Sequence, residues 1–522
     1  AHLGDTAYGT TSIGPMQGDS FTIDGANGAY NINGNNLTGI SVGEDQTLTI
    51  QNVGSATTKV DDEYTFDQSG NLTSINVAKS WTGFGGTGIT LADGAELSIS
   101  NSVFSGNTKG LINADEHYNT NISISNTKFL NNNITSNPYS SMIASSGTMS
   151  FTGIEFLNNT ITQTNLPYVG GFYIGDGHIT EITNSDFNYN TMTTASNVSG
   201  AWGGIIYNAS SASQIDLIQD VNFIGNTLHS ISGAPHGGVI FNQGTISLID
   251  NVVFEDNTMY SDPNQAGGSH GVVIDNNGTS SSITKITNSV FRNNRLYRTG
   301  EYVPSTGNFH ASAGAIDNYC YIGEISDTLF ENNSIESVAS SVGAGAIMNV
   351  YNNYSNEINK IENVNFSGNH VYSQNASAHA GAIGNGAAAN TNGISYIGYI
   401  SALFENNYAQ SDSSYAYGGA ITNGFGNIGT ISANFTGNYA YATGADGYAY
   451  GGAIYNTANA VIGGITGAFT NNYAIATGAS GVGQGGAIWN ASTASGGLTI
   501  TDTNFTGNAS TTAGGAIYNT GA

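Results

Sequence analysis

Basic residues are scarce in this chain of 522 residues. Nine Lys and Arg stand against 36 Asp and Glu, which gives a formal net charge of −27. After Lys360 the sequence contains no Lys or Arg at all. Nucleic-acid backbones and anionic lipid surfaces are bound through clusters of Lys and Arg. We therefore expect no nucleic-acid partner and no binding to an anionic membrane surface.

Cysteine, proline and long apolar runs are also rare or missing. The single Cys320 excludes an internal disulfide framework, and we interpret it as a small buried apolar side chain. The 6 prolines are too few for a proline-rich linker protein and leave strand ladders uninterrupted. Because no run of 18 apolar residues occurs, we expect no membrane-spanning helix. No signal peptide precedes Ala1, so we expect that the signal of an exported precursor has been removed.

Glycine, asparagine, serine and threonine dominate what is present, with 72 glycines in the chain. Short runs such as Ser20–Asp24 and Leu48–Val53 alternate apolar and polar residues between Gly, Asn and Asp. Alternation with a period of two, bounded by turn residues, is typical of β-strands. No segment shows a helical period. The sequence therefore predicts an all-β protein.

Two short signatures repeat along most of the chain. The first is Phe-x-x-Asn, and most of its copies are 31 to 39 residues apart. The second is Gly-Gly-Ala-Ile-x-Asn, and the two alternate without a miss from Phe187 onward. The Phe of the first signature stands at Phe104, Phe129, Phe156, Phe187, Phe223, Phe254, Phe291, Phe330, Phe366, Phe404, Phe435, Phe469 and Phe505.

This alternation predicts a solenoid, a parallel β-helix with about one coil per pair of signatures. We expect three short strands in each coil: the Ala-Ile-x-Asn strand, a middle Ile-x-x-Ile strand and the strand that enters Phe. A loop of variable length then precedes Gly-Gly. We expect residues 1–18 to be a leader or cap, residues 19–100 to form the first coils, and residues 101–522 to form the repeat, with its C-terminal end uncapped.

Stacked coils bring identical positions above one another, about 4.8 Å apart. Phe would stack on Phe inside the tube, and the Asn three residues later would form a hydrogen-bonded ladder at a corner, where it tolerates a left-handed backbone. The paired glycines would allow a bend where a Cβ atom would clash. The predicted structural ladder comprises Phe404, Asn407, Phe435, Asn438, Phe469, Asn472, Phe505 and Asn508.

Tyrosines gather beside the second signature late in the chain. They alternate in segments such as Tyr-Ala-Tyr-Gly-Gly, so they face one side of a strand. Two interpretations stand side by side: a strand face stabilised by ring stacking, or a contact surface for glycans or for another copy of the protein. The residues of this possible contact surface are Tyr415, Tyr417, Tyr439, Tyr441, Tyr448 and Tyr450.

Catalytic and metal-binding patterns were sought in the sequence. Asp61-Asp62-Glu63 is the only acidic cluster, and we interpret it as a solvated turn. The three arginines, Arg292, Arg295 and Arg298, stand at the start of a long variable loop, where we expect Glu301 to pair with one of them. The histidines lack metal-ligand spacing, and no calcium nonapeptide array is present. We therefore expect no enzyme activity, no cofactor and no metal site; a polysaccharide lyase or hydrolase is the alternative.

The alternating signatures resemble the repeats of the chlamydial polymorphic outer-membrane proteins. More loosely, they are similar to the passenger domains of type V autotransporter adhesins. The resemblance rests on Gly418-Gly419-Ala420-Ile421 with Phe435 and Asn438, and on Gly451-Gly452-Ala453-Ile454 with Phe469 and Asn472. It covers about four fifths of the chain, from residue 101 onward. It implies a single-stranded right-handed β-helix at a bacterial surface, with adhesion and virulence as usual roles.

The predicted function is therefore a secreted or cell-surface β-helical adhesin or structural protein that displays variable loops for binding. Its expected partner is a protein or glycan on a host or neighbouring cell. A second hypothesis concerns assembly: the sequence stops directly after a complete Gly-Gly-Ala-Ile signature at Asn519, and an open coil exposes strand edges. Copies of the chain would then stack into an extracellular filament.

Overall fold

The structure is a computed structural model of the chain. It describes residues 20–26, 32–33, 39–54, 64–66, 72–75, 80–83, 86–136, 141–164, 170–194, 200–231, 233–261, 268–299, 311–350, 356–386, 395–493 and 498–521. The predicted leader, residues 1–18, lies outside these ranges. The chain divides into two compact units, Ala1–Ser232 with Val239–Val252 and Gly233–Gly238 with Val253–Ala522. Each unit is described by itself below.

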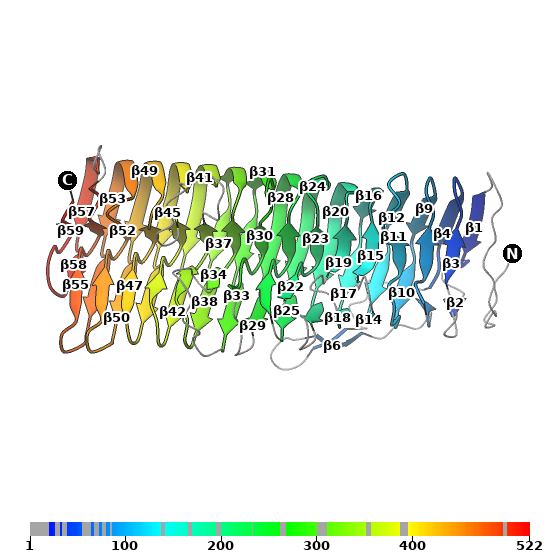
Figure 1. Ribbon diagram of the computed structural model, residues 1–522, viewed down its shortest axis with the longest axis horizontal. Helices are drawn as coiled ribbons and strands as arrows, with labels where there is room; N and C mark the ends of the chain where they lie inside the picture. Colours follow the sequence, from blue (N-terminus) through cyan, green and yellow to red (C-terminus); the bar gives the residue numbers. More distant parts are fainter. Residues whose placement is uncertain are drawn as a thin grey trace. The chain divides into compact units, whose positions relative to one another are not determined.

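All regular elements of the described residues are β-strands. Strands of successive coils pair side by side and in parallel, as Figure 1 shows within each unit. The described pairing of β5 (Tyr64–Phe66) with β6 (Leu72–Ile75) is antiparallel. The parallel strands form four rows. The Phe row contains the Phe of the first signature, and the post-Asn row follows the ladder Asn. The pre-Gly row precedes Gly-Gly, and the Ile row contains the Ile of the second signature. The predicted all-β parallel β-helix is confirmed.

The second unit shows all four rows. The Phe row holds β31 (Ser282–Thr287), β32 (Val290–Arg292), β36 (Tyr321–Ser326), β37 (Leu329–Glu331), β41 (Glu357–Ser367), β45 (Tyr396–Glu405), β49 (Asn427–Thr436), β53 (Val461–Thr470) and β57 (Ile500–Thr506). The post-Asn row holds β29 (Thr258–Ser261), β33 (Arg295–Arg298), β38 (Ser334–Ser337), β42 (His370–Ser373), β46 (Tyr408–Ser411), β50 (Tyr439–Ala442), β54 (Tyr473–Ala476) and β58 (Ala509–Ser510).

The other two rows of this unit consist of shorter strands. The pre-Gly row holds β34 (Ala311–Ala313), β39 (Val342–Ala344), β43 (Ala378–His379), β47 (Tyr415–Tyr417), β51 (Tyr448–Tyr450) and β55 (Val482–Gln484). The Ile row holds β30 (Ile274–Asn276), β35 (Ile316–Asn318), β40 (Ile347–Asn349), β44 (Ile383–Asn385), β48 (Ile421–Asn423), β52 (Ile454–Asn456), β56 (Ile488–Asn490) and β59 (Ile517–Asn519).

The first unit repeats the plan. Its Phe row includes β1 (Ser20–Asp24), β4 (Thr47–Gln51), β9 (Glu96–Ser100), β10 (Val103–Ser105), β12 (Asn121–Ser125), β13 (Lys128–Leu130), β16 (Thr148–Thr152), β17 (Glu155–Leu157), β20 (His178–Asn188) and β24 (Gln214–Ile224). Its post-Asn row holds β14 (Asn133–Ser136), β18 (Thr160–Gln163), β21 (Thr191–Thr194) and β25 (Thr227–Ser230). Its Ile row includes β8 (Ile89–Leu91), β11 (Ile112–Ala114), β15 (Ser141–Ser145), β19 (Gly170–Ile174) and β23 (Ile206–Asn208).

The coil differs from the predicted one in two ways. The middle Ile-x-x-Ile segment and the segment that enters Phe form one continuous strand in β45, β49 and β53. The segment between the ladder Asn and Gly-Gly, which we predicted to be a variable loop, contributes the post-Asn and pre-Gly strands instead. The physical reason is that Tyr-Ala-Tyr segments bury alternate alanines, such as Ala416 and Ala449, against the tube interior.

Phenylalanine rings stack inside the coils. Phe435 lies between Phe404, at a centroid distance of 4.7 Å, and Phe469, at 4.6 Å, and the rings are parallel within 8°. All three are fully buried, whereas Phe505 is half-buried. Isoleucines of the Ile row form a second interior stack, with Ile454 as one member. Each stack buries one large apolar side chain per coil, which stabilises the tube.

The paired glycines lie at a tight bend, for two separate reasons. Gly451 has a φ of +65°, a left-handed conformation that side chains with a Cβ atom rarely adopt. A Cβ atom on Gly452 would lie 2.1 Å from the carbonyl oxygen of Gly486 in the next coil. The close approach of consecutive coils therefore requires glycine at this second position.

Candidate binding surfaces

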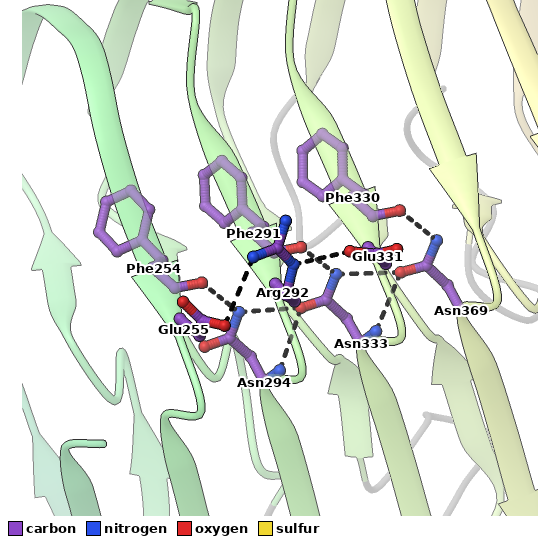
Figure 2. A network of polar contacts seen from close by, with 9 residues as sticks. All are labelled: Phe254, Glu255, Phe291, Arg292, Asn294, Phe330, Glu331, Asn333 and Asn369. Carbon is purple, nitrogen blue, oxygen red and sulfur yellow. Dashed lines mark hydrogen bonds and ion pairs between the residues drawn. The ribbon is translucent and has the colours of Figure 1, made fainter. Parts of the chain in front are cut away.

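The asparagines of the first signature form a continuous hydrogen-bonded ladder within the second unit. Figure 2 shows part of it, at Asn294, Asn333 and Asn369. The Oδ1 atom of each Asn accepts bonds from the backbone N–H and the side-chain amide of the Asn one coil earlier. Its own Nδ2 donates to the next Oδ1 and to a Phe carbonyl of the preceding coil, as Asn333 does to Phe291 at 2.8 Å. Each buried amide thus satisfies both its donors and its acceptor.

The predicted ladder residues take part in the same pattern. Asn407 donates to Asn438 at 3.0 Å, Asn438 to Asn472 at 3.0 Å, and Asn472 to Asn508 at 2.9 Å. The left-handed residue, however, is the one before the ladder Asn: φ is +56° at Asn406 and +68° at Gly437. Our placement of that conformation on the ladder Asn was wrong. The ladder Asn must keep its side chain pointing inward, and its neighbour makes the turn instead.

A second ladder runs along the end of the Ile row, which sequence reasoning did not recognise. Asn423 donates to Asn456 at 2.9 Å, and Asn456 donates to Asn490 at 2.8 Å. Asn423 also donates to the carbonyl oxygen of Val461 at the start of β53, in the next coil. The sequence does contain a signal for this ladder, because the same Asn is the last residue of every copy of the second signature.

The arginines are used in ion pairs along the strands. Arg292 lies between Glu255 of β28 (Thr245–Glu255), at 3.4 Å, and Glu331, at 2.6 Å, as Figure 2 shows. Arg295 pairs with Glu336 at 2.5 Å. All three predicted loop arginines therefore belong to strands, Arg292 to β32 and Arg295 and Arg298 to β33. Arg292 and Arg295 have partners other than the expected Glu301. Glu301 and the acidic cluster Asp61-Asp62-Glu63 lie outside the described residues.

A buried polar cluster lies where β26 (Ala234–His236) and the chain before Gly271 approach the Ile row. The imidazoles of His236 and His270 stack at 4.6 Å. The Nδ1 atom of His236 lies 2.8 Å from Asp275, and that of His270 lies 3.0 Å from Asp317. Both carboxylates are fully buried. Consecutive coils thus present two parallel histidine–carboxylate pairs.

The cluster contains Ser, His and Asp, but its geometry does not form a catalytic triad. The Oγ atom of Ser312 and the hydroxyl of Tyr319 approach the same His270 Nδ1 that faces Asp317, at 2.9 and 2.7 Å. A triad needs the nucleophile on the opposite ring nitrogen. Ser312 is moreover buried and donates its hydrogen bond to Asp317. The described residues contain no group of three or more His, Cys, Asp and Glu side chains arranged to hold a metal ion.

Burial and pairing shift the pKa values of this cluster. Burial opposes the charged form of His270, but the hydrogen bond and charge of Asp317 outweigh it, so the pKa of His270 lies above 6.5. Burial raises the pKa of Asp317 to about 6, against the lowering effect of His270. Burial lowers the pKa of His236 although Asp275 opposes this.

These shifts predict how stability depends on pH. Above pH 6.5, His270 retains its proton in the folded chain and loses it in the unfolded chain, so the free energy of unfolding falls as pH rises. Asp317 acts in the same direction between pH 3.8 and about 6, while His236 opposes it only below 6.5. We expect the urea midpoint to fall as the pH rises above 6.5, and to fall less in His270→Gln. An equal fall in both proteins would contradict the assignment.

Aromatic rings gather on the outside of the coils at the pre-Gly and Ile rows. We name this set the aromatic face: His379, Tyr415, Tyr417, Tyr448, Tyr450, Tyr455 and Trp489. Tyr415 stacks on Tyr448 at 5.0 Å and 16°, and Tyr450 stacks on Trp489 at 5.1 Å and 19°. The exposed fraction of Tyr415 is 37%, and most of the other rings are half-buried. In-register strands thus align the rings into a surface that spans four coils.

The aromatic face offers ring edges and hydroxyls, because the ring faces cover one another. No described residue bonds to the hydroxyls of Tyr415, Tyr417, Tyr448, Tyr450 or Tyr455. Burial raises the pKa of Tyr450 to about 12 and lowers that of His379 to about 3, so both side chains are neutral at physiological pH. The surface is therefore uncharged, with hydroxyls that can donate and accept hydrogen bonds.

The six predicted tyrosines do not form one stripe. Four of them, Tyr415, Tyr417, Tyr448 and Tyr450, belong to the aromatic face. Tyr439 lies on β50 in the post-Asn row, where it stacks on Tyr408 at 4.8 Å and 3°. Tyr441, on the same strand, has Gln410 and Ile475 as its neighbours in adjacent coils.

The predicted contact surface leaves out three members of the aromatic face. His379 aligns with the second tyrosine of the Tyr-Ala-Tyr segments, since it pairs with Tyr417. Tyr455 and Trp489 occupy the variable position of the Ile-x-Asn strands. Aligning the repeats by strand would have found all three, whereas a search for tyrosines could not find His379 or Trp489.

Searches of protein-family models, curated proteins and solved structures found no match to the chain. In the part of the chain that the structure describes, no helix is long and apolar enough to cross a membrane.

Proposed function

We propose that the protein is an exported bacterial β-helical adhesin that binds a protein on a host or neighbouring cell through the aromatic face. The observation that carries this proposal is the in-register row of partly exposed tyrosines and Trp489 on three consecutive coils. Tyrosine and tryptophan dominate the energetic centres of protein interfaces. Held by strand pairing and by one another, these rings lose little conformational freedom on binding.

A protein partner suits this surface better than a glycan does. Sugar rings pack against exposed aromatic faces, and here the faces of Tyr415 and Tyr448 are turned toward each other. The phenol hydroxyls and ring edges that remain can bond to the backbone and polar side chains of a partner. The negative net charge of −27 favours a partner with a neutral or basic contact surface.

Tyr415→Ser combined with Tyr448→Ser tests the proposal. We expect the double variant to bind cultured epithelial or neighbouring bacterial cells at least about thirtyfold more weakly, because each ring is a central contact. Binding of the fluorescently labelled protein to cells is the measurement, before and after treatment of the cells with protease or glycosidase. Protease should abolish the binding of the unaltered protein.

Tyr396→Ser is the matched control. Tyr396 lies on β45 in the Phe row and is 38% exposed, close to the 37% of Tyr415, but it belongs to another surface. The control should bind like the unaltered protein. Equal binding by the double variant, or binding that only glycosidase removes, would contradict a protein-binding aromatic face.

A further inference from the structure

Three consecutive coils of the Phe row lack one residue that the other coils have. The inward Ile and the following Phe are five positions apart in β41 (Ile361, Phe366) and in β57 (Ile500, Phe505). In β45, β49 and β53 the distance is four positions, as from Ile431 to Phe435. The strand pairing shifts register at both borders of this group, between Glu362 and Val364 and between Ile465 and Gly467.

The extra residue forms a projecting bend wherever it is present. Asn363 and Asp502 both occupy this position, with φ values of +55° and +48°, and both are exposed. Such residues bond to one another along the coils, as Asn363 does to Asp327 at 2.5 Å. We call the row of these exposed extra residues the ridge. In β49 this residue is missing, and the side chains alternate between exposed and buried without interruption. Ser432 and Asn434 are exposed, and Ala433 is buried.

The interrupted ridge leaves a groove across β41, β45, β49 and β53. Its volume is about 400 Å³. It reaches from Asn363, the ridge residue before the interruption, to Gly467. Three strand spacings correspond to a length of about 14 Å. The groove crosses the strands, so each coil contributes equivalent positions to its walls. A regular polymer segment laid along it would meet a similar set of side chains at each coil.

The walls of the groove are uncharged and combine polar with apolar side chains. Ser401, Ser432 and Asn434 supply hydroxyl and amide groups, and no lining residue carries an ionisable side chain. The side chain of Leu403 is 43% exposed and adds an apolar contact. The Oδ1 atom of Asn365 is buried against the groove and accepts no hydrogen bond from the described residues. An unpaired buried oxygen is costly, and a hydroxyl donor from a ligand would relieve it after a small rotation of the amide.

We propose that this groove binds a neutral oligosaccharide. Hydroxyl and amide side chains both donate and accept, which matches the hydroxyls of a sugar, and Leu403 offers a surface for its C–H groups. An extended peptide fits less well, because β49 and its neighbours are paired on both sides and offer no free strand edge for its backbone. An acidic polymer would find no cation in the groove of a chain with a net charge of −27.

This second site is independent of the aromatic face, and its test uses a different probe. Soluble tetrasaccharides of glucose, N-acetylglucosamine, xylose and mannose, with a galacturonate tetramer as the acidic member, are titrated against the full chain by calorimetry. At least one neutral member should bind with one-to-one stoichiometry, and the acidic member should not. Tyr415→Ser with Tyr448→Ser should leave this binding unchanged, so the two proposals fail separately.

Ser432→Trp fills the groove, and Thr436→Trp is its matched control. Both residues are exposed on β49, but Thr436 does not line the groove. Ser432→Trp should weaken binding at least tenfold, while Thr436→Trp should leave it unchanged. Asn434→Ala, which adds no bulk, should also weaken binding if Ser432→Trp fails to fold. Absence of binding to every neutral member, binding of the acidic member alone, or equal binding by the groove variants and the unaltered protein would overturn the proposal.

Discussion

Phe435→Ala is expected to destabilise its coil by about 4 kcal/mol, since a fully buried ring leaves a cavity between two others. The ring loses contact with Phe404 and Phe469, which lie 4.7 and 4.6 Å away. In a solenoid each coil is stabilised mainly by its neighbours, so the effect should remain local. Amide hydrogen exchange in β45, β49 and β53 should accelerate about a thousandfold, whereas strands several coils away should keep their rates.

Phe435→Leu is the control for this cavity. Leucine keeps most of the apolar volume, so the loss should be no more than about 1.5 kcal/mol and the exchange should change much less. Equal protection in Phe435→Ala and the unaltered protein would mean that the phenylalanines do not form the interior stack.

Asn438→Ala is expected to cost a similar amount, about 4 kcal/mol, for a different reason. Its side chain makes four hydrogen bonds of 2.9 to 3.0 Å, two from Asn407, one to Phe404 and one to Asn472. Alanine would leave the N–H groups of Asn407 and the carbonyl oxygen of Phe404 buried without partners. Hydrogen exchange of the Asn407 backbone amide, which bonds directly to Asn438, is the most sensitive measurement.

Asn434→Ala is the control that separates the loss of the ladder from the loss of an ordinary asparagine. Asn434 lies four residues earlier, on β49, and its side chain is exposed. We expect a change of less than about 0.5 kcal/mol. If both alanine variants exchanged alike, the ladder would contribute nothing beyond an ordinary surface asparagine.

The arrangement of the coils could be predicted because the residues of the interior recur at regular intervals in the sequence. Residues equivalent to Phe435 and Asn438 recur in each coil, because each side chain must stack on its counterpart in the preceding coil. The spacing of the two residue types in the sequence therefore indicates how the coils stack. The left-handed residue before the ladder was missed because that position is shared by Asn406 and Gly437, which look like loop residues in isolation. The post-Asn and pre-Gly strands were missed because alanine, as in Ala416, is a weak apolar signal.

The candidate surfaces were harder to predict, because they depend on strand register. His270 and Asp317 are 47 residues apart, and the pairing of strands such as β30 with β35 brings their coils together. Trp489 joined the aromatic face only when its strand was aligned with that of Tyr455. The groove follows from a missing residue, which becomes visible once Ile431 and Phe435 are aligned with their counterparts in other coils.

The distance between spin labels at Ser367→Cys and Thr506→Cys, with Cys320→Ser, tests the coil stacking on which both surfaces depend. The two positions are 139 residues apart in sequence but four strand steps apart in the Phe row, through Glu405, Thr436 and Thr470. Four steps predict a backbone separation of about 19 Å, with a narrow distribution. A broad distribution, or a separation well above about 30 Å after allowance for the label linkers, would contradict the in-register β-helix.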